Sequence, residues 1–285
     1  MNALVAYPTA PSTIRNFPVQ LPELVVTGER YLTRIARSKE EIDAALRLRF
    51  AVFNIELGLG WTKSYMDGKD EDEFDAQSTH VILIDRHLNR VVGTCRLQTY
   101  TSTDPYPFAS AINFDVSAIP AAVLSNSLEV GRLCLAKSYR NKSCITQLRD
   151  FILSYANETA KKHLLTCFAL KSQDPLVGGQ LFERINQLGH AQSEFRVVPR
   201  PGAKCMFYRM PIPSIRRQLP SSLRSFLKLG GKICGMPAIN RDFKTIEYFG
   251  MLTLNYGTVS TQTRNVAHNF QQASQLNPQV GSSKQ

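Results

Sequence analysis

Hydrophobic positions divide the middle of the chain into helical and extended segments. Ser38 and Glu41 form an S-x-x-E capping box, which predicts that a helix begins there. Apolar residues then recur at helical spacing from Ile42 to Phe53, and Arg49 lies on the same face. Because a buried arginine needs an anionic partner or a substrate, Arg49 is a candidate functional residue.

The pattern beyond this helix predicts alternating strands and helices. Strands are expected at 80–85, 90–97, 128–135, 164–170, 194–199 and 204–210, and helices begin near 143 and 180. The order α, β, β, β, α, β, α, β, β predicts an α/β layered fold with a mixed sheet. Residues 1–28 are predicted to be an N-terminal arm, 29–257 the folded domain and 258–285 a disordered polar tail.

Composition supports one folded domain and argues against a membrane-spanning, secreted or metal-binding protein. The chain has 285 residues, of which 43% are hydrophobic and 20% charged, so it holds enough apolar residues for a core. It contains no membrane-spanning run and no secretory signal at its start, which predicts a cytoplasmic protein. The six cysteines form no CxxC pair and the histidines do not cluster near them, so reduced thiols and no bound metal are expected.

Charge is distributed unevenly along the chain. The net charge is +11, and residues 200–232 carry eight lysines and arginines without a single acid. This basic stretch, which includes a basic C-terminal extension from about residue 212, favours an acidic protein partner. Its segment 220–228 is a basic amphipathic helix candidate that would also suit the inner face of an anionic membrane. A merely solvated basic surface is the alternative, and the scarcity of interleaved aromatic residues argues against nucleic acid.

Three groups of polar residues are candidates for chemistry. Arg140-x-x-Ser143 lies between a strand and a helix, where backbone N–H groups and the helix dipole suit an anion; an ordinary helix start looks the same. Glu129 and Arg132 lie in an otherwise apolar strand. Strict alternation places them on opposite faces, but a bulge at Gly131 would bring both to one face. A structural ion pair is the alternative.

The third group combines Asp72-x-x-Asp75 with Arg49 and Arg96. Charges of both signs next to apolar segments predict a network of ion pairs. This network would either shape a polar substrate site or hold the first helix in place.

Several of these segments resemble the GNAT acyltransferase superfamily. The resemblance is strongest to ornithine-lipid N-acyltransferases and N-acyl amino acid synthases, which are relatives of acyl-homoserine lactone synthases. It covers residues 30–255 and rests on L-R-F-A-V-F-N-I-E-L-G at 48–58, D-E-F-D at 72–75, V-V-G-T-C-R-L-Q-T at 91–99, E-V-G-R-L-C-L at 129–135, S-Q-D-P at 172–175 and G-M-P-A-I-N-R-D-F-K-T-I-E-Y-F at 235–249. It implies a mixed, mostly antiparallel sheet flanked by helices.

The resemblance also implies roles for individual residues. The acceptor side and its charge network would consist of Arg49, Phe53, Trp61, Asp72, Asp75, Arg96, Glu129 and Arg132. The phosphopantetheine of the acyl donor would be bound by Leu133, Cys134, Leu135, Arg140 and Ser143. The family's loop is R-x-x-G-x-G/A, and here Ser143 and Ile145 replace both glycines. A carrier-protein donor, which has one phosphate, fits this departure better than coenzyme A.

The function implied is N-acyl transfer from an acyl carrier protein thioester, or from acyl-CoA, to the amine of an amino acid. No bound cofactor is expected. The attacking amine must lose a proton, and Glu129 is the first candidate base, with His80 the second. Backbone N–H groups near Leu133 and Cys134 would stabilise the oxyanion. The alternatives are an acyl-homoserine lactone synthase that uses S-adenosylmethionine and a non-catalytic acyl-binding or membrane-binding protein.

Overall fold

The computed structural model describes residues 23–100, 106–191, 194–206 and 219–255. In these ranges the main sheet consists of β1 Val25–Thr27, β2 Tyr31–Ile35, β3 Thr79–Asp85, β4 Arg90–Thr99, β6 Ser127–Leu135, β7 His163–Leu170, β9 Lys232–Ile233, β10 Ala238–Asn240 and β11 Thr245–Thr253. A separate small ladder joins β5 Phe114–Asp115 to β8 Val198–Pro199. The helices are α1 Lys39–Phe50, α2 Ala121–Ser125, α3 Lys142–Glu158, α4 Pro175–Gln187 and α5 Ser221–Lys228.

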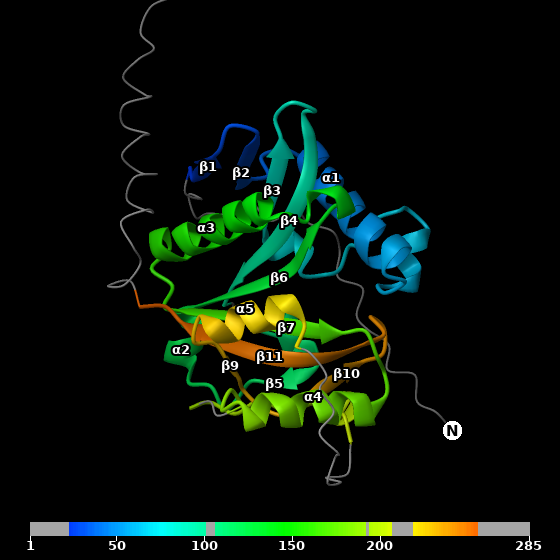
Figure 1. Cartoon of the computed structure of the whole chain (residues 1–285), viewed down its shortest axis with the longest axis vertical. Coiled ribbons are helices and arrows are strands. Elements are labelled where there is room, and N and C mark those ends of the chain that lie inside the picture. The colour runs from blue at the N-terminus through cyan, green and yellow to red at the C-terminus, as the bar shows by residue number, and fades with distance from the viewer. Residues whose placement is uncertain (1–22, 101–105, 192–193, 207–218, 256–285) are drawn as a thin grey trace, which may run out of the picture.

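The sheet is mixed and mostly antiparallel, as predicted. Its strands run in the order β1-β2-β3-β4-β6-β7-β11-β10, with β9 also paired to β11. Only β6 and β7 are parallel neighbours, and their pairing is limited to Ser127–Glu129 against residues 163–165. Beyond Glu129 the two strands diverge (Figure 1), and the stretch where their backbones are no longer paired is called the opening of the sheet.

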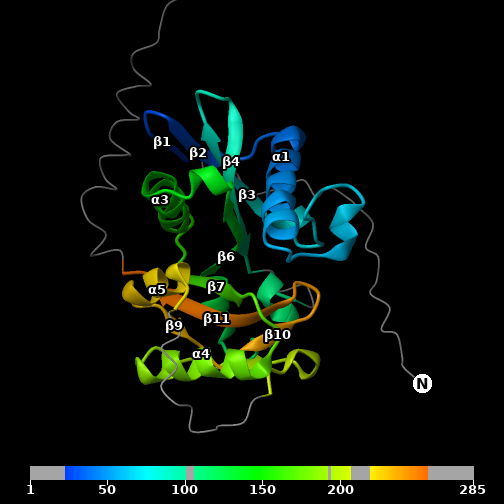
Figure 2. The ribbon, with the colours of Figure 1, turned by 45° about the vertical axis from the view of Figure 1, so that its right-hand side comes forward.

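Helices cover the two faces of the sheet in different ways. On one face, α3 packs over β1–β4 and β6 through Leu148, Phe151 and Ile152. The helices α4 and α5 cover β7 and β11 on the same face. On the other face, α1 packs against β3, β4 and β6, and the segment from the 3₁₀ turn Ala109–Ile112 through β5 covers β7 and β11 (Figure 2). All the charged candidate residues of β4 and β6 lie on this α1 face.

Helix α1 begins where the capping box predicts. The Ser38 Oγ accepts a hydrogen bond from the Glu41 N–H at 3.3 Å. The Glu41 carboxylate accepts from the Arg37 N–H instead of the Ser38 N–H, and it also pairs with Arg34. The helix continues into a π-helical turn, Ala51–Glu56, and the chain leaves it at Gly58, whose φ is +64°.

Some predicted boundaries are wrong. Residues 25–27, expected in the arm, form β1 at the edge of the sheet. The strand expected at 194–199 is reduced to Val198–Pro199, and in the strand expected at 204–210 Lys204 forms a single bridge to Ala238, while residues 207–210 lie outside the described ranges. Helix α4 begins at Pro175 rather than near 180 because Asp174 caps it and proline fits its first turn.

Other predictions fall where the structure gives no description. These include most of the arm, the tail, and residues 212–218 of the basic extension; the helix predicted at 220–228 is present as α5. In the described ranges, no helix has the length and apolar character needed to cross a bilayer.

The capping of α1 generates a stability prediction. Replacing Ser38 by alanine removes the acceptor for the Glu41 N–H, so the free energy of unfolding should fall by about 1 kcal/mol. Urea denaturation should show a lower midpoint and an unchanged m-value. Ser225→Ala, at an exposed position inside α5, is the matched control and should leave the midpoint nearly unchanged. Equal effects in the two variants would contradict the capping role.

Candidate active site

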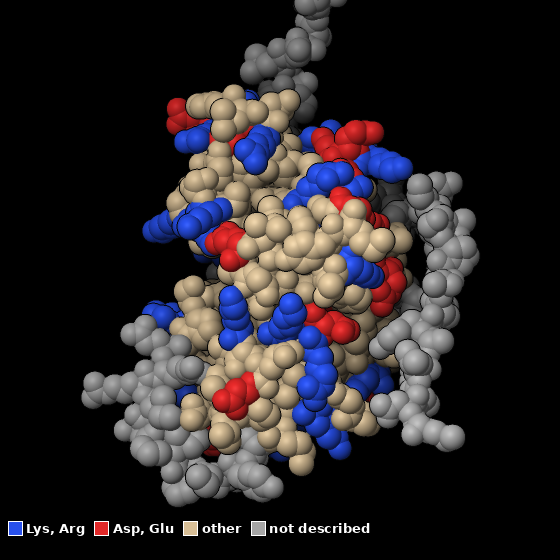
Figure 3. All heavy atoms as spheres, turned by 90° about the vertical axis from the view of Figure 1, so that its right-hand side faces the viewer, with Lys and Arg blue, Asp and Glu red and all other residues tan. Residues whose placement is uncertain are grey.

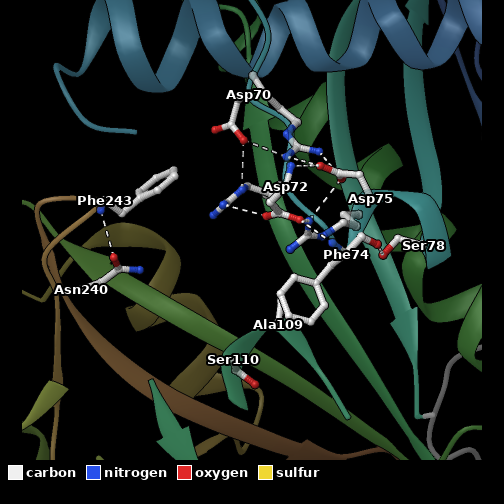
Figure 4. A network of polar contacts seen from close by, with 12 residues as sticks. Asp70, Asp72, Phe74, Asp75, Ser78, Ala109, Ser110, Asn240 and Phe243 are labelled. Carbon is white, nitrogen blue, oxygen red and sulfur yellow. Dashed lines mark hydrogen bonds and ion pairs between the residues drawn. The ribbon is translucent and has the colours of Figure 1, made fainter. Parts of the chain in front are cut away.

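Three arginines and three aspartates form a buried network on the α1 face. Arg49 of α1 binds both Asp75 carboxylate oxygens, at 2.7 and 3.1 Å, and Asp70 at 2.8 Å. Arg96 of β4 binds Asp72 and, at 3.2 Å, Asp75. The network predicted from Arg49, Asp72, Asp75 and Arg96 is therefore present, and Figure 4 shows the three aspartates converging.

Arg132 of β6 completes this network. Its guanidinium pairs with Asp72 at 3.0 Å and with Asp70 at 3.3 Å. Asp70 was not expected in the site. It enters because its backbone N–H bonds to the Leu46 carbonyl, which places the carboxylate beside α1. The three positive and three negative charges cancel, as burial requires.

The ion pairs of the network favour the charged forms of Asp75 and Arg49. Burial opposes the charge on Asp75, but Arg96 and Arg49 outweigh it and lower the pKa of this carboxyl. Burial likewise opposes the charge on Arg49, yet Asp75 and Asp70 raise its pKa. Both groups therefore stay ionised throughout the physiological pH range.

A β-bulge brings Glu129 and Arg132 to the same face. Between the pairs Thr94–Cys134 and Arg96–Gly131, β6 uses one residue more than β4. Arg132 takes up the irregularity with a φ of +50°, one position after the glycine where the bulge was expected. The two residues do not pair with each other: Arg132 binds the aspartates and Glu129 binds Ser110.

Glu129 lies at the last residue of β6 that pairs with β7. Its carboxylate accepts hydrogen bonds from the Ser110 backbone N–H, at 3.3 Å, and from the Ser110 hydroxyl. The side chain is buried, and burial raises the pKa of Glu129 although the Ser110 bonds oppose this. A buried carboxylate with a raised pKa beside an opening of the sheet is suited to accept a proton.

His80, the second candidate base, lies next to Asp75 of the ion-pair network. It lies on β3 opposite Arg96, and its Nε2 is 3.2 Å from the Asp75 carbonyl oxygen. Burial lowers the pKa of His80, so the ring is neutral at pH 7. Its Nε2 is also 3.8 Å from the Asp75 carboxylate, so the ring lies against Asp75.

Phe53 and Trp61 lie at the border of the network. Phe53, in the π-helical turn, contacts the Phe243 ring edge-to-face with centroids 5.6 Å apart. Phe243 also lies under the Arg132 guanidinium, 4.3 Å from its ring centroid. Trp61 is half-buried, and its carbonyl accepts from the Asn54 side chain.

The donor-side residues lie along the diverging part of β6 and in the loop after it. Leu133 is exposed, whereas Cys134 and Leu135 are buried. Burial raises the pKa of Cys134 to about 12, so this thiol is not a nucleophile at neutral pH. Ser143 is exposed in the first turn of α3. Arg140 forms a two-pronged ion pair with Glu56, with both N–O distances 2.7 Å.

Sequence reasoning missed a second buried carboxylate, Glu247. It lies on β11, where Asn240 donates to it at 2.9 Å and Asn113 at 3.1 Å. The segment that contains Asn240 and Glu247 was noticed only for its resemblance, because no strand was predicted at 245–253. Among the residues that the structure describes, no group of histidine, cysteine and carboxylate side chains is arranged to hold a metal ion.

Comparisons with known proteins show which family part of the chain matches. Residues 48–150 match the family described as the acetyltransferase (GNAT) domain. This range contains α1 from Leu48 onward, the aspartate loop, β4 and the bulged strand β6.

Curated relatives extend the likeness over most of the chain. An L-ornithine N(alpha)-acyltransferase of Agrobacterium fabrum is 23% identical over 236 residues, which is 78% of this chain and 80% of that protein. The enzyme of the same name from Rhodobacter capsulatus is 27% identical over 256 residues, 82% of this chain and 93% of that protein. FeeM, an N-acyl amino acid synthase from uncultured soil microbes, aligns over 79% of this chain and 90% of its own, with 13% identity and a TM-score of 0.44. Residues 48–150 therefore contain a GNAT domain, and this domain together with the curated relatives supports an acyltransferase.

Proposed function

We propose that this enzyme moves a fatty acyl group from a carrier-protein thioester to the α-amine of an amino acid. The observation that carries the proposal is the position of Glu129, a buried carboxylate at the point where β6 and β7 separate. The names of the curated relatives favour an amino acid acceptor over S-adenosylmethionine.

The opening between β6 and β7 is the proposed seat of the donor's pantetheine arm. Along it, residues 130–133 of β6 and 166–170 of β7 are all at least partly exposed. Their facing backbone groups have no partner strand, so an extended amide-containing arm can bond to them as a strand would. At the inner end of this opening the thioester would lie beside Glu129.

The chemistry then needs one base and one oxyanion site. The neutral amine attacks the thioester carbonyl carbon, a C–N bond forms, and Glu129 accepts the proton that the amine loses. The tetrahedral intermediate collapses as the C–S bond breaks, and the proton passes to the departing thiolate. The proposed oxyanion donors are the backbone N–H groups of Leu133, which has no register partner on β4, and of Cys134, which lies opposite Thr94.

Within the charge network, we assign different roles to Arg49 and Arg132. Arg49 is 1% exposed, and both of its terminal nitrogens are bound by Asp70 and Asp75, so it serves as a scaffold. Arg132 has a side-chain exposure of 17%, pairs with Asp70 and Asp72, and lies over the Phe243 ring. It is therefore the arginine that an acceptor carboxylate can reach.

The carrier protein is the proposed donor partner because basic side chains stand beside the opening. Phe226 of α5 packs on Phe168, in the diverging part of β7, and Arg224 and Lys228 are exposed on the same helix. On the face shown in Figure 3, basic side chains cover more of the lower part than acidic ones do. Acyl carrier proteins are acidic, so opposite charges would attract the two molecules. An anionic membrane surface beside α5 remains part of this proposal.

Mass spectrometry of lipid extracts from cells that express the chain tests the reaction directly. A new N-acyl amino acid, absent from cells that express Glu129→Gln, would support the proposal and name both substrates. Binding of acyl carrier protein without any new product, also when candidate amines and S-adenosylmethionine are supplied, would contradict it.

Glu129→Gln should lower kcat by about 10²- to 10⁴-fold, because the shape is retained and the base is lost. Burial raises the pKa of Glu129, and a base acts only when deprotonated. Wild-type turnover should therefore rise with pH up to that raised pKa and then level off, and the variant should lack this rise. Glu158→Gln, at an exposed position of α3, is the control for charge removal. Near-normal kcat in Glu129→Gln would exclude Glu129 as the base.

Arg49→Met should lower the free energy of unfolding by about 3–5 kcal/mol, because it leaves buried aspartates without a counter-charge. Arg47→Met is the matched control on the same helix. Its ion pair with Asp43 is largely exposed, so we expect a change below about 1 kcal/mol. Chemical denaturation of both variants measures the difference, and similar losses would show that Arg49 is not a scaffold.

The double variant Arg224→Gln/Lys228→Gln should weaken binding of acyl carrier protein by about three- to tenfold at low salt. The loss should shrink as salt is added, since screening weakens the attraction in the wild type too. Lys39→Gln/Arg90→Gln, exposed positions away from α5, is the control. If calorimetry shows the same affinity for the α5 variant and the wild type, the basic surface has no role in docking.

A further inference from the structure

Glu247 is a buried carboxylate that the proposed reaction leaves without a role. It lies opposite Ala169 in the β7–β11 register, and Glu129 lies opposite Leu165 of the same β7 strand. Residues 165, 167 and 169 of a strand share one face, so both carboxylates lie on the α1 face of the sheet. The two carboxylates also interact electrostatically with each other.

Two amides hold the Glu247 carboxylate in one orientation. Asn240 donates to Oε1 from the adjacent strand, and Asn113 donates to Oε2 from the segment before β5. Asn240 is itself fixed, because its Oδ1 accepts from the Phe243 N–H at 2.9 Å. Figure 4 shows Asn240 and Phe243 on one side of the aspartates, with Ser110 below.

No cation in the described part of the chain forms an ion pair with Glu247. Arg132 attracts Glu247 without forming an ion pair with it, and its guanidinium is bound to Asp70 and Asp72. A buried carboxylate without a counter-charge is costly, and neutral amide donors offset only part of that cost. In agreement with this, burial raises the pKa of Glu247 despite the bonds from Asn240 and Asn113.

This carboxylate is close to solvent at one point. Glu247 as a whole residue is 9% exposed, and its cross-strand neighbour Ala169 is an exposed residue with a small side chain. Glu129 is deeper, since its own neighbour Leu165 is fully buried. A ligand with two amino groups could therefore place one at Glu129 and the other at Glu247.

We propose that Glu247, fixed by Asn113 and Asn240, binds the side-chain ammonium of a diamino acid acceptor and sets acceptor selectivity. The proposal rests on the N-acyl transfer to an amino acid proposed above. The ammonium supplies the counter-charge that the protein does not provide. Glu247 acts on selectivity, while proton transfer remains with Glu129.

The test compares acceptors that differ only in the second ammonium. With saturating acyl donor, the full chain is assayed with L-ornithine and L-norvaline, and with L-lysine and L-norleucine. The variant Glu247→Gln keeps the shape and a carbonyl acceptor for Asn240. We expect its kcat/KM for the diamino acids to fall about 10- to 100-fold, mainly through KM. The values for norvaline and norleucine should stay the same or rise.

Glu247→Asp, which keeps the charge, should retain part of the preference for diamino acids. A purely structural role would lower turnover of all four acceptors alike, and that result would overturn the proposal. If the wild type acylates no amino acid, the proposed function fails, and calorimetry then decides about Glu247 separately. Equal affinity of the wild type and Glu247→Gln for L-ornithine would exclude Glu247 from ammonium binding.

Discussion

Charge balance in a buried space is the constraint on which the site depends. Arg49, Arg96 and Arg132 come from α1, β4 and β6, and Asp70, Asp72 and Asp75 come from one loop. None of these groups can be left alone, since an unpaired buried charge costs several kcal/mol. The loop has little regular structure, yet its aspartates are fixed because three separate elements each bring a cation to them. The network thus holds α1 on the sheet and orders the loop at the same time.

This network also accounts for the irregular path of β6. Arg132 adopts a left-handed backbone conformation, which costs about 1 kcal/mol or more for a residue with a side chain. The ion pairs with Asp70 and Asp72 offset this cost, and they are available only because the bulge turns Arg132 toward the α1 face. The same bulge lies just beyond the last β6 residue that pairs with β7. The strained backbone of Arg132, its ion pairs and the opening of the sheet are therefore all located at the β6 bulge.

The sequence predicts what depends on local pattern. The start of α1, the strands around residues 80–97 and 128–135 and the contact of Arg49 and Arg96 with the aspartates could all be inferred from spacing and from the cost of burying charge. Asp70 was missed because its place depends on a backbone bond to Leu46. Strand β11 was missed because eight of its nine residues are buried, so no alternation appears. The hydrogen bonds of Glu247 to Asn113 and Asn240 join separate segments of the chain, and a local sequence pattern does not predict such contacts.

The opening between β6 and β7 would separate the sheet into two halves unless something crossed it on the α1 face. The β10–β11 hairpin supplies this connection, since Phe243 contacts Phe53 of the first half and lies under Arg132. Lys171, just after β7, adds a bond to the Leu57 carbonyl. These contacts brace the opening on the side where the acceptor is proposed to lie and leave the α3 and α5 side for the donor. The hairpin that braces the two halves also carries Asn240 and Glu247, so the stability of the opening and the chemistry of the acceptor site depend on the same short segment.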